Sequence, residues 1–189
     1  MNRFKFFKEG IRNLKTVGTV TRSSRYLCDK IINHSKIHQA RAIIELGAGD
    51  GVLTKHILDR MPADCKLISF EINDFFIDSL EAIDDDRLVV AADSADNIHH
   101  YLDQEKFDQV DIIYSAIPFS VLPKELARSI VTKSKSVLVD EGEYLQIHYS
   151  LMEKKLYESV FGNVEVFFQP INIPPAFILK CVNETNGMK

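Results

Sequence analysis

The sequence lacks the features of membrane-spanning, secreted and disulfide-rich proteins. No apolar run approaches the roughly 18 residues that a membrane-spanning helix needs. The first residues, MNRFKFFKEGIRNLKTVG, have neither the apolar core nor the cleavage site of a secretory signal. The three cysteines, Cys28, Cys65 and Cys181, are far apart and odd in number, which predicts buried small side chains in a reducing compartment. These absences predict a cytoplasmic protein.

A metal site is also not expected. The adjacent pair His99 and His100 is the most histidine-rich point of the chain, but adjacent side chains on a helix do not converge. No cysteine or third ligand is spaced to complete a zinc site with them. We therefore interpret the pair as lying in a loop or at a helix end, and we predict no metal.

The net charge of −4 conceals a strong asymmetry. Residues 1–37 contain nine Lys and Arg against two acids, a net charge of +7, whereas the remainder has 14 bases and 25 acids, a net charge of −11. A basic segment on an acidic body indicates contact with a polyanion, either nucleic acid or an anionic membrane. We therefore divide the chain into a basic segment, residues 1–37, and a second domain, residues 38–189.

The basic segment contains an amphipathic pattern. Apolar and basic residues each recur at helical spacing, and the basic stripe borders the apolar one, as in helices that lie in a membrane interface. Each cation near an anionic leaflet contributes about 1 kcal/mol. Two alternatives remain: the helix packs on the second domain, or it contacts RNA phosphates. The residues predicted to contact the membrane are Phe4, Lys5, Phe7, Lys8, Ile11, Arg12, Leu14 and Lys15.

After residue 40, short apolar runs alternate with longer amphipathic stretches, which predicts parallel strands covered by helices on both faces. The end of the chain, VEVFFQPINIPPAFILKCV, has two apolar runs too close for a crossover helix, so the last strand should be antiparallel. The predicted strands are residues 41–46, 66–72, 87–92, 109–115 and 143–150, followed by two more within 164–182. The predicted helices are residues 51–61, 74–83, 123–138 and 151–161.

The stretch IIELGAGDGVLTKHI, residues 43–57, predicts a ligand-binding turn between a strand and a helix. Gly47 and Gly49 let the backbone turn sharply and approach a ligand closely. Glu45 and Asp50 are unsuited to a diphosphate but suit a ligand with ammonium and sulfonium charges. The stretch resembles the glycine-rich motif of class I S-adenosylmethionine (SAM) methyltransferases. This resemblance implies an α/β, three-layer Rossmann-like fold with a seven-stranded, mostly parallel sheet, an antiparallel last strand and a preceding amphipathic helix.

Polar residues follow the next strands as well. In SFEIN, Glu71 lies 22 residues after Gly49, where an acid can accept hydrogen bonds from both ribose hydroxyls. In VVAADSADN, Asp93 and Ser94 are placed to receive an adenine amino group, and Ser115 ends the fourth strand. Open α/β sheets bind ligands at this edge. The predicted cofactor-binding residues are Glu45, Gly47, Ala48, Gly49, Glu71, Ile72, Asp93, Ser94 and Ser115.

The stretch SAIPFSVLP, residues 115–123, resembles two families. In the ribosomal RNA adenine N6-dimethylases the corresponding motif is N-I/L-P-Y/F, and this chain has Ser115 where those enzymes have Asn. The small bacterial phospholipid N-methyltransferases have S-G/A-L/I-P-x…L-P, which SAIPFSVLP fits closely. QIHY (146–149) and VGTVTRSSRYL (17–27) are similar to two further motifs of that family, except that Arg22 replaces a proline.

This second resemblance implies an enzyme that transfers methyl groups from SAM to the amine of a membrane aminolipid, such as phosphatidylethanolamine or an ornithine lipid. Pro118 would fix the acceptor loop, Ser115 would orient the amine, and His148 and Tyr149 are the next candidate catalytic residues, with His148 a candidate proton acceptor. Arg22 or Arg25 is a candidate to hold a lipid phosphate. The protein would associate peripherally with the inner membrane. The alternatives are an RNA adenine methyltransferase and a non-catalytic SAM-binding protein.

Overall fold

The computed structural model describes residues 23–184. The predicted membrane contacts between Phe4 and Lys15, and the candidate phosphate ligand Arg22, lie outside the described residues. In the described part of the chain, no helix is both long and apolar enough to cross a membrane.

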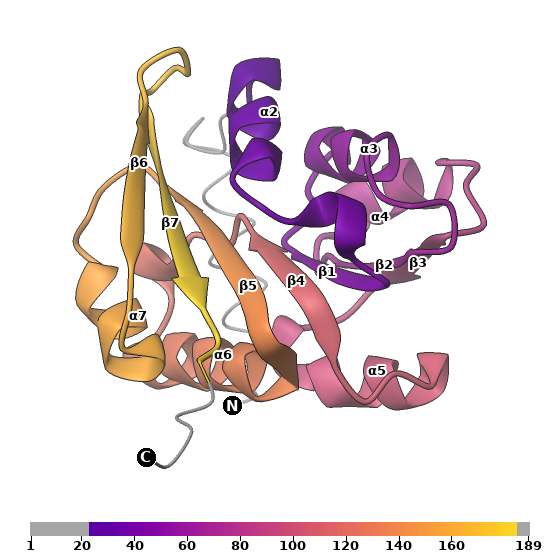
Figure 1. The fold of residues 1–189 in the computed structure, drawn as a ribbon. Coiled ribbons are helices and arrows are strands. Elements are labelled where there is room, and N and C mark those ends of the chain that lie inside the picture. The colour runs from indigo at the N-terminus through magenta and orange to yellow at the C-terminus, as the bar shows by residue number, and fades with distance from the viewer. Residues whose placement is uncertain (1–22, 185–189) are drawn as a thin grey trace.

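One seven-stranded sheet forms the centre of the molecule, in the order β3-β2-β1-β4-β5-β7-β6 (Figure 1). The strands β1 to β5 pair in parallel, and β7 pairs antiparallel with both β5 and β6, as predicted for the last strand. The predicted Rossmann-like architecture is therefore confirmed. The strands are β1 (Ala42–Leu46), β2 (Lys66–Phe70), β3 (Leu88–Ala91), β4 (Val110–Ser115), β5 (Leu138–His148), β6 (Glu165–Gln169) and β7 (Ala176–Val182).

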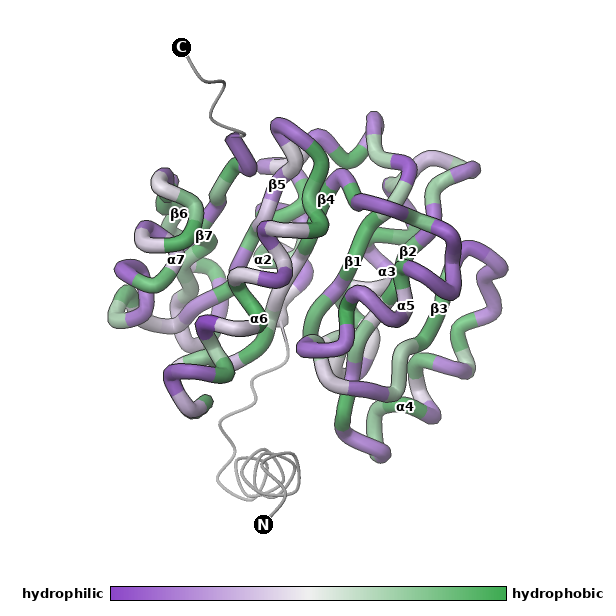
Figure 2. Tube along the Cα trace, turned by 90° about the horizontal axis from the view of Figure 1, so that it is seen from below, coloured by the Kyte–Doolittle hydropathy of each residue, from purple (hydrophilic) through white to green (hydrophobic). Residues whose placement is uncertain are grey.

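Helices cover both faces of the sheet, so β1 and most of β4 are buried on both sides. Apolar side chains of α2 and α3 form one core with one face of the sheet, and those of α5, α6 and α7 form a second core with the other face. Figure 2 shows the hydrophobic strands between more hydrophilic helices. The helices are α2 (Arg25–Asn33), α3 (Val52–Leu58), α4 (Asp74–Glu81), α5 (Ile98–Glu105), α6 (Lys124–Val137) and α7 (Lys154–Phe161).

The helix α5 and the full length of β5 differ from the predictions. The sequence IHHYLDQE has only Ile98 and Leu102 fully buried, so its periodicity was too weak to predict α5. The pair His99-His100 lies in the first turn of that helix. The strand β5 begins at Leu138, five residues before the predicted start, because the chain continues almost directly from α6 into the sheet.

The described end of the basic segment packs on the sheet. Leu27, Cys28, Ile31 and Ile32 on α2 are buried in the same core as β1 and α3. Ser24 caps this helix by accepting a hydrogen bond from the Leu27 amide. At least from α2 onward, these residues belong to the same core as the sheet.

Candidate functional site

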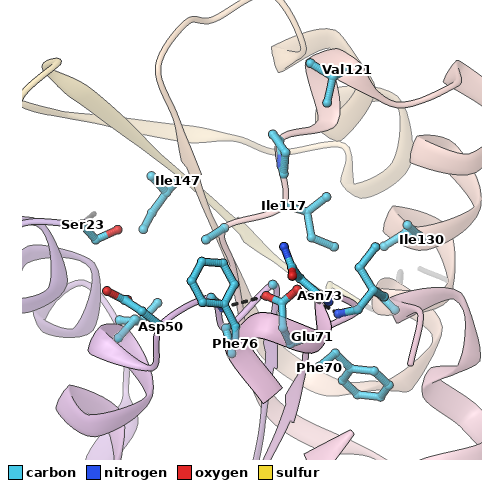
Figure 3. Close-up of a pocket in the computed structure, with 18 of the residues that line it drawn as sticks. Ser23, Asp50, Phe70, Glu71, Asn73, Phe76, Ile117, Val121, Ile130 and Ile147 are labelled. Atoms are coloured by element: carbon cyan, nitrogen blue, oxygen red, sulfur yellow. Dashed lines mark hydrogen bonds between the residues drawn. The ribbon is translucent and has the colours of Figure 1, made fainter. Parts of the chain in front are cut away.

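A pocket of about 610 Å³ opens at the carboxyl ends of β1 to β5. This volume lies within the range of small-molecule sites. The chain leaves β1 towards β2 and β3 on one side, whereas β4 and β5 lie on the other, so the pocket is at the topological switch point of the sheet. Figure 3 shows Glu71 near its centre, with Asp50 and Ser23 on the side opposite Ile130.

The glycine-rich turn after β1 forms one wall. Gly47 and Gly49 have φ angles of +77° and +57°, in the region that L side chains rarely adopt. A Cβ atom at Gly47 would lie 3.3 Å from the Ile117 side chain, whereas one at Gly49 would meet no atom within 4 Å. The turn is held to the sheet because the amides of Gly47 and Ala48 both donate to the Phe70 carbonyl, at 2.8 and 3.0 Å. Gly49 therefore leaves space that a ligand can fill.

Glu71 is held by three backbone amides. Its Oε2 accepts from the Gly49 amide and its Oε1 from the amides of Ile72 and Asn73, each at 2.8 Å. These bonds join the turn after β1 to the end of β2, and the carboxylate still faces the pocket (Figure 3). Each carboxylate oxygen has two lone pairs, so Oε2, which accepts one amide, retains acceptor capacity for a bound hydroxyl.

Asp93 and Ser94 line the pocket after β3. Asp93 Oδ1 accepts from the Ser94 amide at 2.6 Å, and its Oδ2 accepts from the Asn97 side chain at 2.9 Å. Ser94 Oγ accepts from the Asp96 amide. The loop after β3 is thus ordered by the same polar residues that the sequence indicated.

Glu45 lies beneath the pocket and does not line it. Its Oε2 accepts from Thr54 Oγ1 at 2.6 Å and from Ser69 Oγ at 2.7 Å, whereas its Oε1 has no hydrogen-bond partner among the described residues. Burial, the main cause, raises the pKa of Glu45 to about 7, although the two hydroxyl hydrogen bonds lower it. Glu45 therefore supports the floor of the site instead of contacting a ligand directly.

The predicted acceptor loop, which follows β4, forms the opposite wall through Ala116, Ile117 and Pro118. Ser115 is fully buried and does not line the pocket. Its hydroxyl is 3.4 Å from the Ile117 amide, from which it accepts. Ser115, which stands where the adenine N6-dimethylases have Asn, therefore stabilises the loop from beneath.

Gln146, on β5, supports the same loop, a role that the sequence did not lead us to assign. Its Nε2 donates to the carbonyls of Ile117 and Ile147, at 3.0 and 2.8 Å, and its Oε1 accepts from the Tyr144 hydroxyl at 3.0 Å. The side chain is fully buried. Its hydrogen bond to the Ile117 carbonyl fixes the peptide group before Pro118. The sequence feature that could have indicated this role is the Gln of the QIHY motif.

His148 and Tyr149 end β5 and line the pocket. The buried His148 ring shares a 2.7 Å hydrogen bond between its Nε2 and the Tyr157 hydroxyl of α7. Burial lowers the pKa of His148 to about 4, so the ring is neutral near pH 7. Tyr149 is partly exposed at the mouth.

The charge of the lining is of one sign. Asp50, Glu71 and Asp93 contribute carboxylates, and no Lys or Arg of the described residues lines the pocket. Arg25 points to solvent, with its Nε 3.9 Å from Asp29, and does not line the pocket. Asn73 and Phe76 were not predicted as lining residues, although they lie only two and five positions after Glu71 in the sequence. This lining favours a cationic ligand.

A model of the methyltransferase small domain family matches residues 16–171. The chain belongs to this family. It is therefore a methyltransferase, and its cofactor is S-adenosylmethionine. The pocket fits that molecule on two observations of the structure: the space beside Gly49 and the acidic lining, which suits sulfonium and ammonium groups.

Known proteins resemble this methyltransferase over most of its length. An ornithine lipid N-methyltransferase of Singulisphaera acidiphila is 33% identical over 181 residues, which cover 94% of this chain and 92% of the relative. The crystal structure of the N-methyltransferase NodS from Bradyrhizobium japonicum has a TM-score of 0.68 at 12% identity, covering 85% of this chain and 96% of that one. Aeropyrum pernix fibrillarin with bound S-adenosyl-L-methionine has a TM-score of 0.61 at 17% identity, covering 78% and 69%.

Proposed function

We propose that this methyltransferase transfers methyl groups from S-adenosylmethionine to the amine of a membrane aminolipid, with an ornithine lipid or phosphatidylethanolamine as the acceptor. The observation that carries the proposal is the 33% identity to an ornithine lipid N-methyltransferase over 94% of the chain. The motif SAIPFSVLP in the acceptor loop supports it.

The half of the pocket around β1 to β3 would hold the cofactor, which supplies an electrophilic methyl group when it is bound. Glu71, fixed by three amides, would accept a hydrogen bond from a ribose hydroxyl through Oε2. Asp93 and Ser94 would receive the adenine amino group. The Gly47–Gly49 turn would let the backbone approach the ligand, and Ile72 would lie beside it.

The half around β4 and β5 would hold the amine. A lipid amine resembles the lysine side chain, with a reference pKa of about 10.4, and it must release a proton to water before its nitrogen can attack the methyl group. The apolar wall of Ile117, Pro118 and Ile147 would favour the neutral amine because burial disfavours the charged form. His148, with its pKa lowered to about 4, is a poor proton acceptor. We therefore assign His148 and Tyr149 the role of orienting the amine by hydrogen bonding.

Membrane association belongs to the same proposal. The basic and apolar stripes between Phe4 and Lys15 would bring the enzyme to the anionic inner surface of the membrane, where its substrate lies. The relative's lipid substrate supports this location, because such a substrate is presented at a bilayer surface.

Lipid analysis tests the proposal. The chain should be expressed in a host without methylated aminolipids, beside the Glu71→Ala variant as a control for cofactor dependence. We expect mono-, di- or trimethylated aminolipids with the unchanged chain and none with Glu71→Ala. Methylated adenine in ribosomal RNA with unchanged lipids would assign the enzyme to the alternative substrate class.

A further inference from the structure

Among residues 23–184, most of the exposed large apolar side chains lie at one edge of the sheet. Six of them lie on three neighbouring segments at the carboxyl end of β5: the start of α2, the residues after β5, and the loop between β6 and β7. We call this group the apolar rim. It consists of Tyr26, Tyr149, Leu151, Met152, Ile171 and Ile173.

The three segments are held side by side. His148 at the end of β5 pairs with Phe177 near the start of β7, so the loop before β7 leaves the sheet beside the pocket. Ser24 joins α2 to that loop: its amide donates to Asn172 Oδ1 at 3.0 Å and its hydroxyl to the Ile171 carbonyl at 3.1 Å. Figure 1 shows the β6–β7 loop beside α2 at the top of the view.

Four of the six rim residues are more than half exposed to solvent. The side chains of Ile173 and Met152 are 88% and 83% exposed, and those of Ile171 and Tyr26 are 61% and 56% exposed. The other exposed large apolar side chains of residues 23–184 are Phe75 and Val121, which follow β2 and β4 at this same edge, and Val166 and Phe168 on β6. The opposite edge, where β1 to β5 begin, exposes none of the described large apolar side chains.

We propose that the apolar rim inserts into the lipid surface and places the mouth of the pocket against the bilayer. This inference rests on the proposed function, because a lipid amine must enter the pocket from the membrane. Tyr149 belongs to both the rim and the pocket lining, so the contact surface is continuous with the acceptor site. Ser23, where residues 1–22 join the described chain, also lines the pocket, so the basic sequence is attached at this edge.

A bilayer explains the arrangement better than a second protein. A rigid partner seated on this edge would cover the mouth through which the acceptor must pass. A lipid surface covers the same side chains and also supplies the substrate. Tyr26 and Tyr149 have the amphipathic rings that are enriched at membrane interfaces.

A single tryptophan can measure the insertion, because the chain contains none. The probe variants are Ile173→Trp in the rim and Ala63→Trp in an exposed turn at the opposite edge. With phosphatidylcholine vesicles containing phosphatidylglycerol, we expect a blue shift for Ile173→Trp and quenching by brominated acyl chains, and neither for Ala63→Trp. Unchanged emission of Ile173→Trp while the protein sediments with the vesicles, or no sedimentation at all, would overturn the proposal.

A double variant tests how much the rim contributes to vesicle affinity. Ile171→Ser combined with Ile173→Ser should lower vesicle affinity about tenfold, since two apolar side chains lose their burial in lipid. Val166→Ser, an exposed apolar position away from the rim, should leave it unchanged. Emission of Ile173→Trp that is already blue-shifted without vesicles, whether from residues 1–22 or from a second copy covering the rim, would contradict the proposal.

The same double variant distinguishes this inference from the proposed function. On a short-chain aminolipid dissolved as monomers, it should methylate as fast as the unchanged chain, and only its rate on vesicles should fall. If the unchanged chain methylates neither form of the lipid, the proposed function fails, while the tryptophan measurement still decides whether the rim inserts.

Discussion

The two halves of the pocket are built from different chemistry. In the half around β1 to β3, carboxylates line the pocket, and backbone amides hold the central one, Glu71. In the half around β4 and β5, buried neutral groups hydrogen-bond beneath an apolar wall, as Gln146 does to the Ile117 carbonyl. A cationic cofactor suits fixed negative charge, whereas an amine that must become neutral suits an apolar surface with few charges. On this difference we propose that the cofactor binds in the first half and the amine in the second.

Removing the fixed carboxylate tests the cofactor half most severely. Glu71→Ala leaves three amides without their acceptor and should weaken SAM binding by about 10- to 150-fold, given roughly 1.5–3 kcal/mol for a hydrogen bond to a charged group. Isothermal titration calorimetry measures this loss. Glu71→Gln is the shape-matched control and should retain part of the affinity. An unchanged dissociation constant in Glu71→Ala would remove Glu71 from the site.

Filling the space of the glycine turn should have the next largest effect. Gly47→Ala places a Cβ 3.3 Å from Ile117 at a φ angle of +77°, so both SAM affinity and stability should fall, the affinity by about tenfold and the stability by about 1–2 kcal/mol. Gly162→Ala is a matched control, because it has a φ angle of +83° with no atom within 4 Å and lies outside the pocket lining. It should lose similar stability but keep its SAM affinity. Equal affinities in both variants would contradict the close approach at Gly47.

Loosening the acceptor loop should separate the halves kinetically. Gln146→Ala removes the donors to the Ile117 and Ile147 carbonyls, so the turnover number should fall several-fold to tenfold while the SAM dissociation constant changes less than about twofold. Gln146→Glu retains the acceptor for Tyr144 but loses the amide donors, and it should resemble the alanine variant. A parallel loss of SAM affinity would show that Gln146 serves the whole pocket and not the acceptor loop.

The smallest expected effects concern the pH dependence of stability, for which Glu45 and His148 should contribute slopes of opposite sign. The pKa of Glu45 is raised to about 7, so the folded state retains a proton that the unfolded state has lost, and stability due to Glu45 falls as pH rises from about 4.5 to 7. The pKa of His148 is lowered to about 4, so its contribution rises between about pH 4 and 6.5. Each slope is at most about 1.4 kcal/mol per pH unit.

Urea unfolding at several pH values measures these slopes. The stability of Glu45→Gln relative to the unchanged chain should increase with pH, and that of His148→Gln should decrease with pH. Slopes of the same sign in both variants would contradict the assigned pKa shifts.

Most strands and helices could be predicted from the sequence because apolar periodicity and glycine turns are patterns of neighbouring residues. The apolar run of β1 and the glycine turn predicted the switch point, and Glu71, Asp93 and Ser94 lie at the predicted strand ends around the pocket. The helix α5 escaped prediction because only Ile98 and Leu102 give it a fully buried face. Residues 1–22 remain a matter of sequence-based prediction alone.

What the sequence by itself determined is the order of the elements and the positions of the polar residues along them, since apolar periodicity and glycine act over a few neighbouring residues. Only the tertiary structure decided which way each side chain faces. Ser115 ends β4 and Glu45 is the last residue but one of β1, yet both lie under the floor of the pocket, whereas Gln146 reaches across to the Ile117 carbonyl. The apolar rim likewise exists only because the antiparallel pairing of β7 returns residues 171 and 173 to the end of β5. Facing and contact depend on which strands pair, and pairing joins residues that are far apart in the chain.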